Sequence, residues 1–243
     1  PMRPRHHSRA RPASVVMAES TSRYRPPSIW QRLFYQFVRT FTLALFKVLF
    51  GLKRRGMGHV PRQGALLLVC NHQSYLDPPA VGVSLPRVMH PVARASLFDS
   101  PKFGWFIRML NAIPIREDGQ PDAAAIRLAI ELLEQGRVVL VFPEGQRTID
   151  GEIGEFKRGA GLLLRRSKCA VAPVAIVGAY RAWPRSRSKP KLFRRIGVRI
   201  GEPIPHDELM EEGVDVALDR LRREVIALRN ELQDELSIRD RAE

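Results

Sequence analysis

Residues 65–78 read ALLLVCNHQSYLDP, and this stretch decides the fold class of the chain. Its first six residues are apolar without interruption, which is typical of a strand buried on both faces. A polar segment with His72 and Asp77 follows, and Pro78 is well placed in the first turn of a helix. The sequence therefore predicts a buried strand, a tight polar turn and a helix, in this order.

The same alternation continues along the chain. Further buried strands are expected at the apolar runs 88–93, 112–115, 138–142 and 171–177, and a late strand can follow at 198–200. Helical patterns occupy 78–84, 102–110, 122–135 and 157–167. This alternation predicts an α/β domain with a largely parallel central sheet flanked by helices. A length of 243 residues suits one such domain with appendages.

Four regions are expected: a disordered basic arm at 1–27, an amphipathic membrane-associating helix at 28–55, the α/β domain at 56–205 and an acidic helical tail at 206–243. Apolar residues at heptad spacing mark the tail: Val214, Leu218, Leu221, Val225, Leu228 and Leu232. Such a seam packs against its own domain or forms a homodimer contact. Because it spans few repeats, packing within the chain is favoured.

The amphipathic helix has a broad aromatic and aliphatic face. Five of the eleven Phe residues lie between positions 34 and 50, and basic residues stay largely off this face. That pattern is typical of a helix lying in a membrane interface, and the alternative is a helix packed into a soluble core. The longest run without Asp, Glu, Lys or Arg is 14 residues, 63–76, so no ordinary transmembrane helix is expected.

The net charge of +15 is unevenly distributed. Residues 206–243 carry 12 acidic and 6 basic side chains, whereas 180–200 contains eight basic residues and no acidic one. Such an excess points to an anionic partner: nucleic acid, an anionic membrane surface or a phosphorylated substrate. Cys70 and Cys169 both lie in apolar runs and are expected to be reduced core residues, which suits the cytoplasmic face of a membrane.

His72 and Asp77 are the candidate catalytic pair. They follow a predicted strand at its carboxyl end, where active sites of α/β folds lie. A carboxylate that binds one imidazole nitrogen sets the tautomer and raises the basicity of the histidine, as a general base requires. The alternative is that Asp77 only caps its helix and His72 is a hydrogen-bonded turn residue.

A second loop, after the strand at 138–142, gathers charge and glycine. Glu144, Gly145, Arg147 and Lys157 lie in it, and the helix start at 159–161 offers backbone N–H groups to a phosphate. The sequence lacks the Lys-Ser/Thr ending of a P-loop and the Gly-x-Ser-x-Gly of serine hydrolases. Since its histidines have no partners at metal-ligand spacing, no metal is expected.

Three blocks together resemble the 1-acyl-glycerol-3-phosphate acyltransferases: His72-x4-Asp77, 142–147 (FPEGQR) and 171–176 (VAPVAI). The resemblance implies that an acyl group passes from acyl-CoA or acyl-carrier protein to a lysophospholipid hydroxyl, most simply giving phosphatidate, without a covalent acyl-enzyme or a cofactor. It implies that His72 is the base, that Asp77 orients it, and that Glu144, Gly145 and Arg147 shape the acceptor site. It also implies membrane binding through the N-terminal helix.

The chain departs from the family pattern at two places. Arg116 stands one residue before the position where the family has Arg, with Glu117 at that position, and Gln146 replaces the usual Ser or Thr. Arg116 and Lys157 remain candidates for the acceptor phosphate, but another lysolipid, such as a lyso-amino-lipid, or glycerol-3-phosphate stays open as acceptor. Backbone N–H groups near the turn are expected to stabilise the oxyanion. Nucleic-acid binding is the remote alternative, and no nucleic-acid partner is expected.

Overall fold

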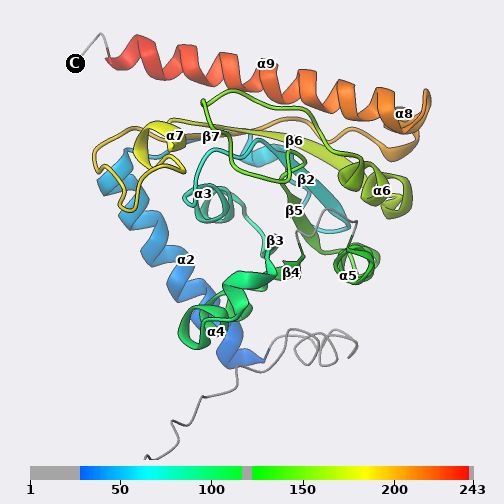
Figure 1. Ribbon diagram of the computed structural model, residues 1–243, viewed down its shortest axis with the longest axis horizontal. Helices are drawn as coiled ribbons and strands as arrows, with labels where there is room; N and C mark the ends of the chain where they lie inside the picture. Colours follow the sequence, from blue (N-terminus) through cyan, green and yellow to red (C-terminus); the bar gives the residue numbers. More distant parts are fainter. Residues whose placement is uncertain (1–27, 117–121, 241–243) are drawn as a thin grey trace, which may run out of the picture.

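A computed structural model describes residues 28–116 and 122–240. It has the predicted architecture, a largely parallel sheet flanked by helices, and the sheet has seven strands (Figure 1). The predicted arm at 1–27 lies outside the described residues, as does Glu117. The predicted α/β fold class is confirmed.

The sheet has the strand order β1-β7-β6-β2-β5-β3-β4. Five strands run parallel: β2 (Leu66–Cys70), β3 (Met89–Arg94), β4 (Ile113–Ile115), β5 (Val138–Val141) and β6 (Ala170–Val177). The late strand β7 (Gly197–Ile200) is antiparallel to β6, and β1 (Lys53–Arg55) is parallel to β7. Residues 53–55 were expected to belong to the amphipathic helix and instead extend the sheet.

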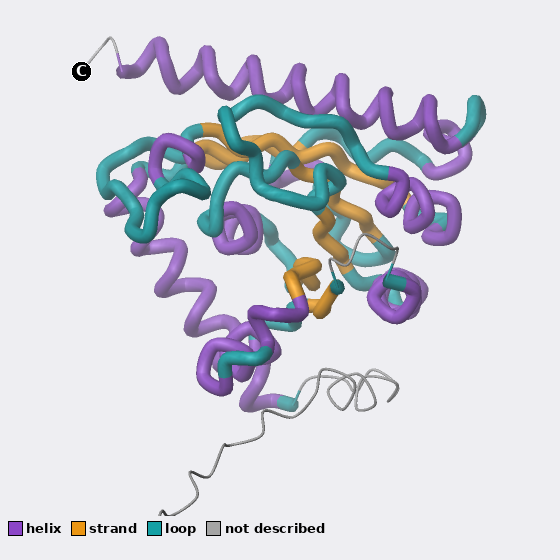
Figure 2. The backbone as a smooth tube through the Cα atoms, in the orientation of Figure 1, coloured by secondary structure: helices purple, strands orange, loops and turns teal. Residues whose placement is uncertain are grey.

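Strand β2 shows how the core is divided. Leu66, Leu68 and Cys70 face one hydrophobic cluster, whereas Leu67 and Val69 face the other, because successive side chains of a strand point to opposite faces. The first cluster is closed by α2 (Ile29–Phe50), α3 (Asp77–Ser84) and α7 (Ala179–Ala182). The second is closed by α5 (Ala123–Glu134), α6 (Arg158–Ser167) and α9 (Val214–Asp240). Figure 2 shows these helices around the strands.

The remaining helices are short. They are η1 (Met57–His59), η2 (Ala95–Phe98), α4 (Pro101–Met109) and α8 (His206–Met210). Helix α4 contacts α2, and an edge-to-face pair of Phe34 and Trp105, with ring centroids 5.7 Å apart, joins them. The helices predicted at 78–84, 102–110, 122–135 and 157–167 lie within one residue of α3, α4, α5 and α6, whereas α2 ends five residues before the predicted end at 55.

Helix α2 touches the domain along a narrow strip. Tyr35, Phe46 and Phe50 are buried, and the Arg39 guanidinium donates to the carbonyl of Leu85. By length and composition α2 could cross a membrane, with a mean hydropathy of 1.4 over its most apolar 18 residues, so the expectation that no segment qualifies was wrong on this criterion. Only 17% of that window is buried in the protein, which argues against the soluble-core alternative.

Helix α9 lies across the sheet and packs on β6 and β7. Its fully buried side chains include Ala217, Leu221, Val225 and Leu232. On its flank, Glu231 and Glu235 lie 2.8 and 2.7 Å from the guanidinium of Arg199 on β7. Most of the heptad seam is therefore packed within the chain, as favoured from the sequence, and the homodimer contact stays a prediction.

Candidate active site

The turn between β2 and α3 brings His72 and Asp77 together. Asp77 Oδ2 lies 2.7 Å from Nδ1 of His72 and also accepts the backbone N–H groups of Gln73 and Ser74. The Asp77 side chain is fully buried, so its carboxylate is shielded from water. One oxygen thus closes the turn and holds the imidazole. Asp77 does not cap its own helix, because the N-cap residue is Leu76 and no side chain bonds to the first turn.

The contact with Asp77 sets the tautomer of His72. A carboxylate accepts hydrogen bonds, so Nδ1 carries the proton and Nε2 carries the lone pair. The ring stacks on Phe142, which follows β5, with centroids 4.0 Å apart and planes inclined by 18°. The His72 side chain is 19% exposed, so part of the imidazole is accessible from outside, and Nε2 is the ring nitrogen that can accept a proton.

Glu144 connects its own loop to the backbone of His72 and to the backbone of Gly154. Its Oε1 accepts the backbone N–H of His72 at 2.7 Å, and its Oε2 accepts that of Gly154 at 3.0 Å. Burial raises the pKa of this carboxyl, while the two backbone N–H groups act in the opposite direction. Glu144 therefore positions the β2 and β5 loops relative to each other and holds the backbone of His72.

Arg147 is held by an aromatic pair. Its guanidinium carbon lies 3.6 Å from the centroid of the Tyr75 ring, and Tyr75 is tilted against Trp183 with centroids 5.4 Å apart. The Nη1 of Arg147 is buried and has no hydrogen-bond partner among the described residues. A buried donor without a partner is costly unless a ligand supplies an acceptor, so this group suits an anion.

Gly145 and Lys157 meet at the same loop. Gly145 has a φ of +69°, which favours glycine, and its N–H donates to Phe142 O at 3.0 Å. A Cβ on Gly145 would lie 3.1 Å from Cδ and Nζ of Lys157, so the ammonium group lies directly over this glycine. The Lys157 backbone N–H also donates to Pro143 O at 2.8 Å. The structure thus brings Lys157 into the loop that holds Glu144 and Arg147.

Arg116 is not brought to this group. It follows β4, the outermost strand on its side and three places from β2, which at the usual strand spacing is about 14 Å. Its guanidinium Nε lies 3.5 Å from Asp122 Oδ2, and its backbone N–H donates to the same carboxylate at 2.9 Å. The acceptor role expected of Arg116 stays a prediction without a contact to the His72 group.

The backbone N–H groups of the turn are already engaged. Those of His72, Gln73 and Ser74 donate to the carboxylates of Glu144 and Asp77. The expectation that N–H groups near this turn bind the oxyanion is therefore wrong for these three. They preorganise the carboxylates instead, and the hydrogen-bond donors for an oxyanion have to lie elsewhere.

Three contacts of the site were missed in the sequence. Phe142 stacks on the base, Tyr75 supports Arg147, and the amide of Asn71 exchanges hydrogen bonds with the backbone of Ile176 at 3.1 and 2.8 Å, tying the end of β2 to β6. In the sequence, Asn71 directly precedes His72, and Phe142 begins the block that contains Glu144 and Arg147. This adjacency could have identified both residues as part of the site. Within residues 28–116 and 122–240, no three His, Cys, Asp or Glu residues gather as a metal site.

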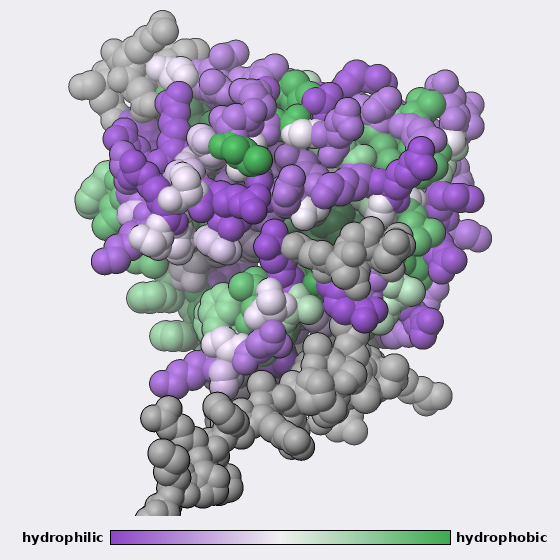
Figure 3. All heavy atoms as spheres, viewed as in Figure 1, coloured by the Kyte–Doolittle hydropathy of each residue, from purple (hydrophilic) through white to green (hydrophobic). Residues whose placement is uncertain are grey.

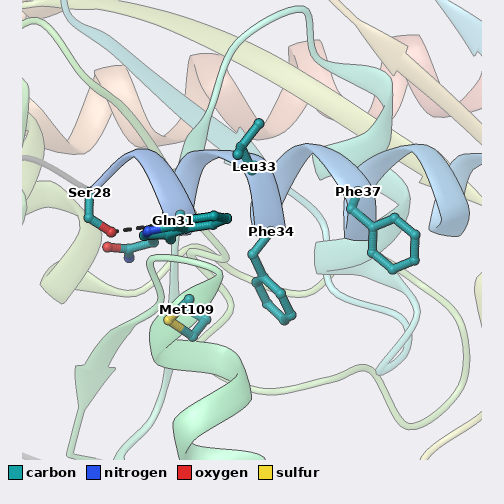
Figure 4. A pocket seen from close by; sticks show the side chains of 7 residues that line it. Ser28, Gln31, Leu33, Phe34, Phe37 and Met109 are labelled. Carbon is teal, nitrogen blue, oxygen red and sulfur yellow. Dashed lines mark hydrogen bonds between the residues drawn. The ribbon is translucent and has the colours of Figure 1, made fainter.

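An apolar groove of about 540 Å³ lies between the start of α2 and the end of α4. Figure 4 shows Phe34 of α2 and Met109 of α4 facing each other across it, while Ser28 Oγ accepts the N–H of Gln31 at 3.2 Å and caps α2. The groove borders the exposed face of α2, which carries Trp30, Leu33 and Phe37. Exposed apolar surfaces of this kind are typical of contacts with lipid or with apolar partners.

Comparison with known proteins gives consistent matches. A family model described as Acyltransferase matches residues 51–177. A 1-acyl-sn-glycerol-3-phosphate acyltransferase of Bacillus subtilis is 28% identical over 173 residues, 70% of this chain and 82% of that protein. The human alpha form is 28% identical over 190 residues, 76% of this chain and 67% of that protein.

Plant relatives are longer. The chloroplastic 1-acyl-sn-glycerol-3-phosphate acyltransferase of Arabidopsis thaliana is 31% identical over 137 residues, and the match spans 56% of this chain but 38% of that protein. Among solved structures, the 1-acyl-sn-glycerophosphate acyltransferase PlsC from Thermotoga maritima matches with a TM-score of 0.67 and 26% identity. That match covers 88% of this chain and 87% of the other.

Proposed function

Because the chain belongs to the Acyltransferase family, we propose that it is an O-acyltransferase that acylates 1-acyl-glycerol-3-phosphate to phosphatidate in phospholipid biosynthesis. The donor is a thioester, acyl-CoA or acyl-carrier protein, and no other cofactor takes part. The relatives from Bacillus subtilis and human and the PlsC structure support this acceptor by their names.

The observation that carries the proposal is the hydrogen bond of 2.7 Å between His72 Nδ1 and a fully buried Asp77. It leaves Nε2 as the proton acceptor of a base that needs no further activation. The acceptor hydroxyl gives its proton to Nε2 as its oxygen attacks the thioester carbonyl carbon. The tetrahedral intermediate then collapses, the C–S bond breaks, and the imidazolium returns the proton to the leaving thiolate.

The phosphate of the acceptor is proposed to bind between Arg147 and Lys157. The unpartnered Nη1 of Arg147 offers a buried donor, and the Lys157 ammonium lies over Gly145 in the same loop. A guanidinium held 3.6 Å from the centre of the Tyr75 ring is restrained in position, which suits a phosphate with fixed oxygen positions. Glu144 acts here by positioning the loop backbone.

The lipid acceptor is proposed to come from a membrane that α2 contacts. An exposed apolar stripe runs along this helix through Trp30, Leu33, Phe37, Phe41, Leu45 and Val48. Its spacing keeps it on one side, opposite the strip packed on the domain, so α2 can lie along the interface on the cytoplasmic face.

An acceptor panel tests the proposal. Full-length protein is supplied with acyl-CoA or acyl-carrier protein and with 1-acyl-glycerol-3-phosphate, glycerol-3-phosphate or a lyso-amino-lipid, and acylated product and free thiol are quantified. Product from 1-acyl-glycerol-3-phosphate well above that from the other acceptors is expected. Transfer to one of the others alone would replace the proposed acceptor, and hydrolysis without transfer would refute the acyltransferase.

A further inference from the structure

The catalytic proposal leaves one strongly charged segment without a role, the loop of residues 183–195, here termed the basic loop. Its exposed basic side chains are Arg185, Arg187, Lys189, Lys191 and Arg194. No acidic residue occurs between 180 and 201, so the charge of this loop is not balanced within the segment. A cationic surface of this density attracts an anionic one.

Apolar side chains stand at the far end of this loop. Phe193 is 76% exposed and Leu192 is 45% exposed. Phe193 has a φ of +58°, a left-handed conformation that a bulky residue rarely adopts. A large aromatic side chain that is both exposed and held in a disfavoured backbone conformation points to a contact outside the protein.

The basic loop is a defined structure with fixed ends. Gly178, before α7, has a φ of +83°, and a Cβ there would lie 2.0 Å from the carbonyl oxygen of Arg195. The N–H of Lys191 donates to Ala182 O at 2.7 Å, and the indole N–H of Trp183 donates to Arg187 O at 3.0 Å. These contacts hold the cationic and apolar side chains in place relative to the sheet.

The loop connects α2 with the active site. The N–H of Phe193 donates to Leu49 O at 2.7 Å, so Phe193 lies beside the last turn of α2, which also carries the exposed Val48. At its other end, Trp183 O accepts the hydroxyl of Ser74 at 2.7 Å, beside Tyr75 and the site. In Figure 1 the yellow loop after α7 lies beside one end of α2.

The surface agrees with this arrangement. Figure 3 shows hydrophobic groups projecting from the left edge of the molecule over α2, with hydrophilic groups above them over the loop that follows α7. An apolar stripe bordered by a cationic patch is the complement of a bilayer whose surface carries anionic head groups.

We propose that the basic loop is a second membrane-contact element, which binds anionic lipid head groups through its Lys and Arg residues and inserts Leu192 and Phe193. It fixes the rotation of the domain about α2, so that the side of the domain that carries Tyr75 and Arg147 faces the bilayer. The proposal rests on the membrane contact proposed for α2 and is independent of the acyl-transfer chemistry. Nucleic acid would use the charges but not the protruding Phe193 and Leu192 beside an apolar helix.

Vesicle co-sedimentation of the full-length protein tests this contact, with phosphatidylcholine vesicles alone or with added phosphatidylglycerol. One variant carries Arg185→Gln, Arg187→Gln, Lys189→Gln and Lys191→Gln. Its control carries Arg127→Gln, Arg165→Gln, Arg166→Gln and Lys168→Gln, which remove the same charge from exposed positions on α5 and at the end of α6. A third variant, Phe193→Gly, removes the side chain at a φ that glycine adopts freely.

The loop variant is expected to lose at least about tenfold in affinity for the anionic vesicles, with the control close to wild type. Phe193→Gly is expected to weaken binding to both vesicle types. Equal losses in loop variant and control would show that net charge alone acts, and unchanged binding of the loop variant would overturn the proposal. Preference of the wild type for a DNA duplex over anionic vesicles would also overturn it. Because binding is measured without turnover, an inactive enzyme leaves this test unaffected.

Discussion

At the scale of single residues, the chemistry depends on how one oxygen is shared. Asp77 Oδ2 contacts Nδ1 of His72 and accepts two backbone N–H groups, so the proposed base is oriented by a group that also shapes the turn. Asp77 is therefore a poor position at which to separate catalysis from folding. His72 is a better position for this purpose, because no backbone N–H group donates a hydrogen bond to its side chain.

Replacing His72 by Ala tests the base. Loss of general-base catalysis is expected to reduce acyl transfer by about 10²- to 10⁴-fold, with unchanged circular dichroism. The rate is measured as acceptor-dependent release of thiol. His206→Ala, which removes an imidazole that contacts Leu164 O far along the chain, is the matched control. Substantial transfer by folded His72→Ala would contradict the mechanism.

Tyr75 offers a test of how Arg147 is positioned. Tyr75→Ala removes the ring beneath the guanidinium and is expected to raise the KM for the acceptor about 5- to 30-fold with a smaller change in kcat, given the usual strength of a cation–π contact. Tyr75→Phe retains the ring and is expected to restore the KM. An equal loss in both variants would assign the effect to the hydroxyl group instead.

His90 links stability to pH. This imidazole is buried on β3, and burial, aided by the positive charge of Arg137, lowers its pKa from 6.5 to about 4. Between these values the unfolded chain binds the proton and the folded one does not, so stability is complete above pH 6.5 and falls as the pH drops towards 4. His90 is expected to account for about 3 kcal/mol of this loss. Urea unfolding of wild type and His90→Gln across this range measures it, and parallel pH profiles would contradict it.

At the scale of helices and strands, α9 belongs to the core of the domain. Leu221 is fully buried in the cluster formed with β2, β5 and β6, so Leu221→Ala is expected to lower the free energy of unfolding by about 2–5 kcal/mol. The exposed Arg223→Ala on the same helix is the control and is expected to change it by less than about 0.5 kcal/mol. Urea denaturation distinguishes them. A change below 1 kcal/mol for Leu221→Ala would mean that α9 docks only loosely.

The sequence predicted most elements because their signals are local. Continuous apolar runs mark strands that are covered on both faces, and β2, β5 and β6 lie where such runs stand. Strand β1 was missed because Lys53, Arg54 and Arg55 carry no apolar signal and pair only once β7 is in place. In the site, the spacing of His72 and Asp77 is local and was readable, whereas the stacking of Tyr75 on Arg147 and of Phe142 on His72 joins segments about 70 residues apart.

At the scale of the whole molecule, the exposed stripe of α2 predicts where the protein resides. Phe37 and Phe41 stack on each other with centroids 6.4 Å apart and face outward. Phe37→Gln with Phe41→Gln is expected to move the protein from the membrane to the soluble fraction without lowering its thermal midpoint, because neither ring is buried. Fractionation and a thermal melt measure this. Retention of the double variant at the membrane would contradict the membrane contact proposed for this stripe.

The close approach of Gly178 to the Arg195 carbonyl makes the segment between them suitable for protein engineering. Because the chain leaves the sheet and returns to it at nearly the same point, the segment between can change in length and composition while the strands stay in register. Gly178 and Arg195 are therefore suitable junctions for grafting loops from other enzymes. The membrane preference proposed for this loop could then be engineered separately from the reaction.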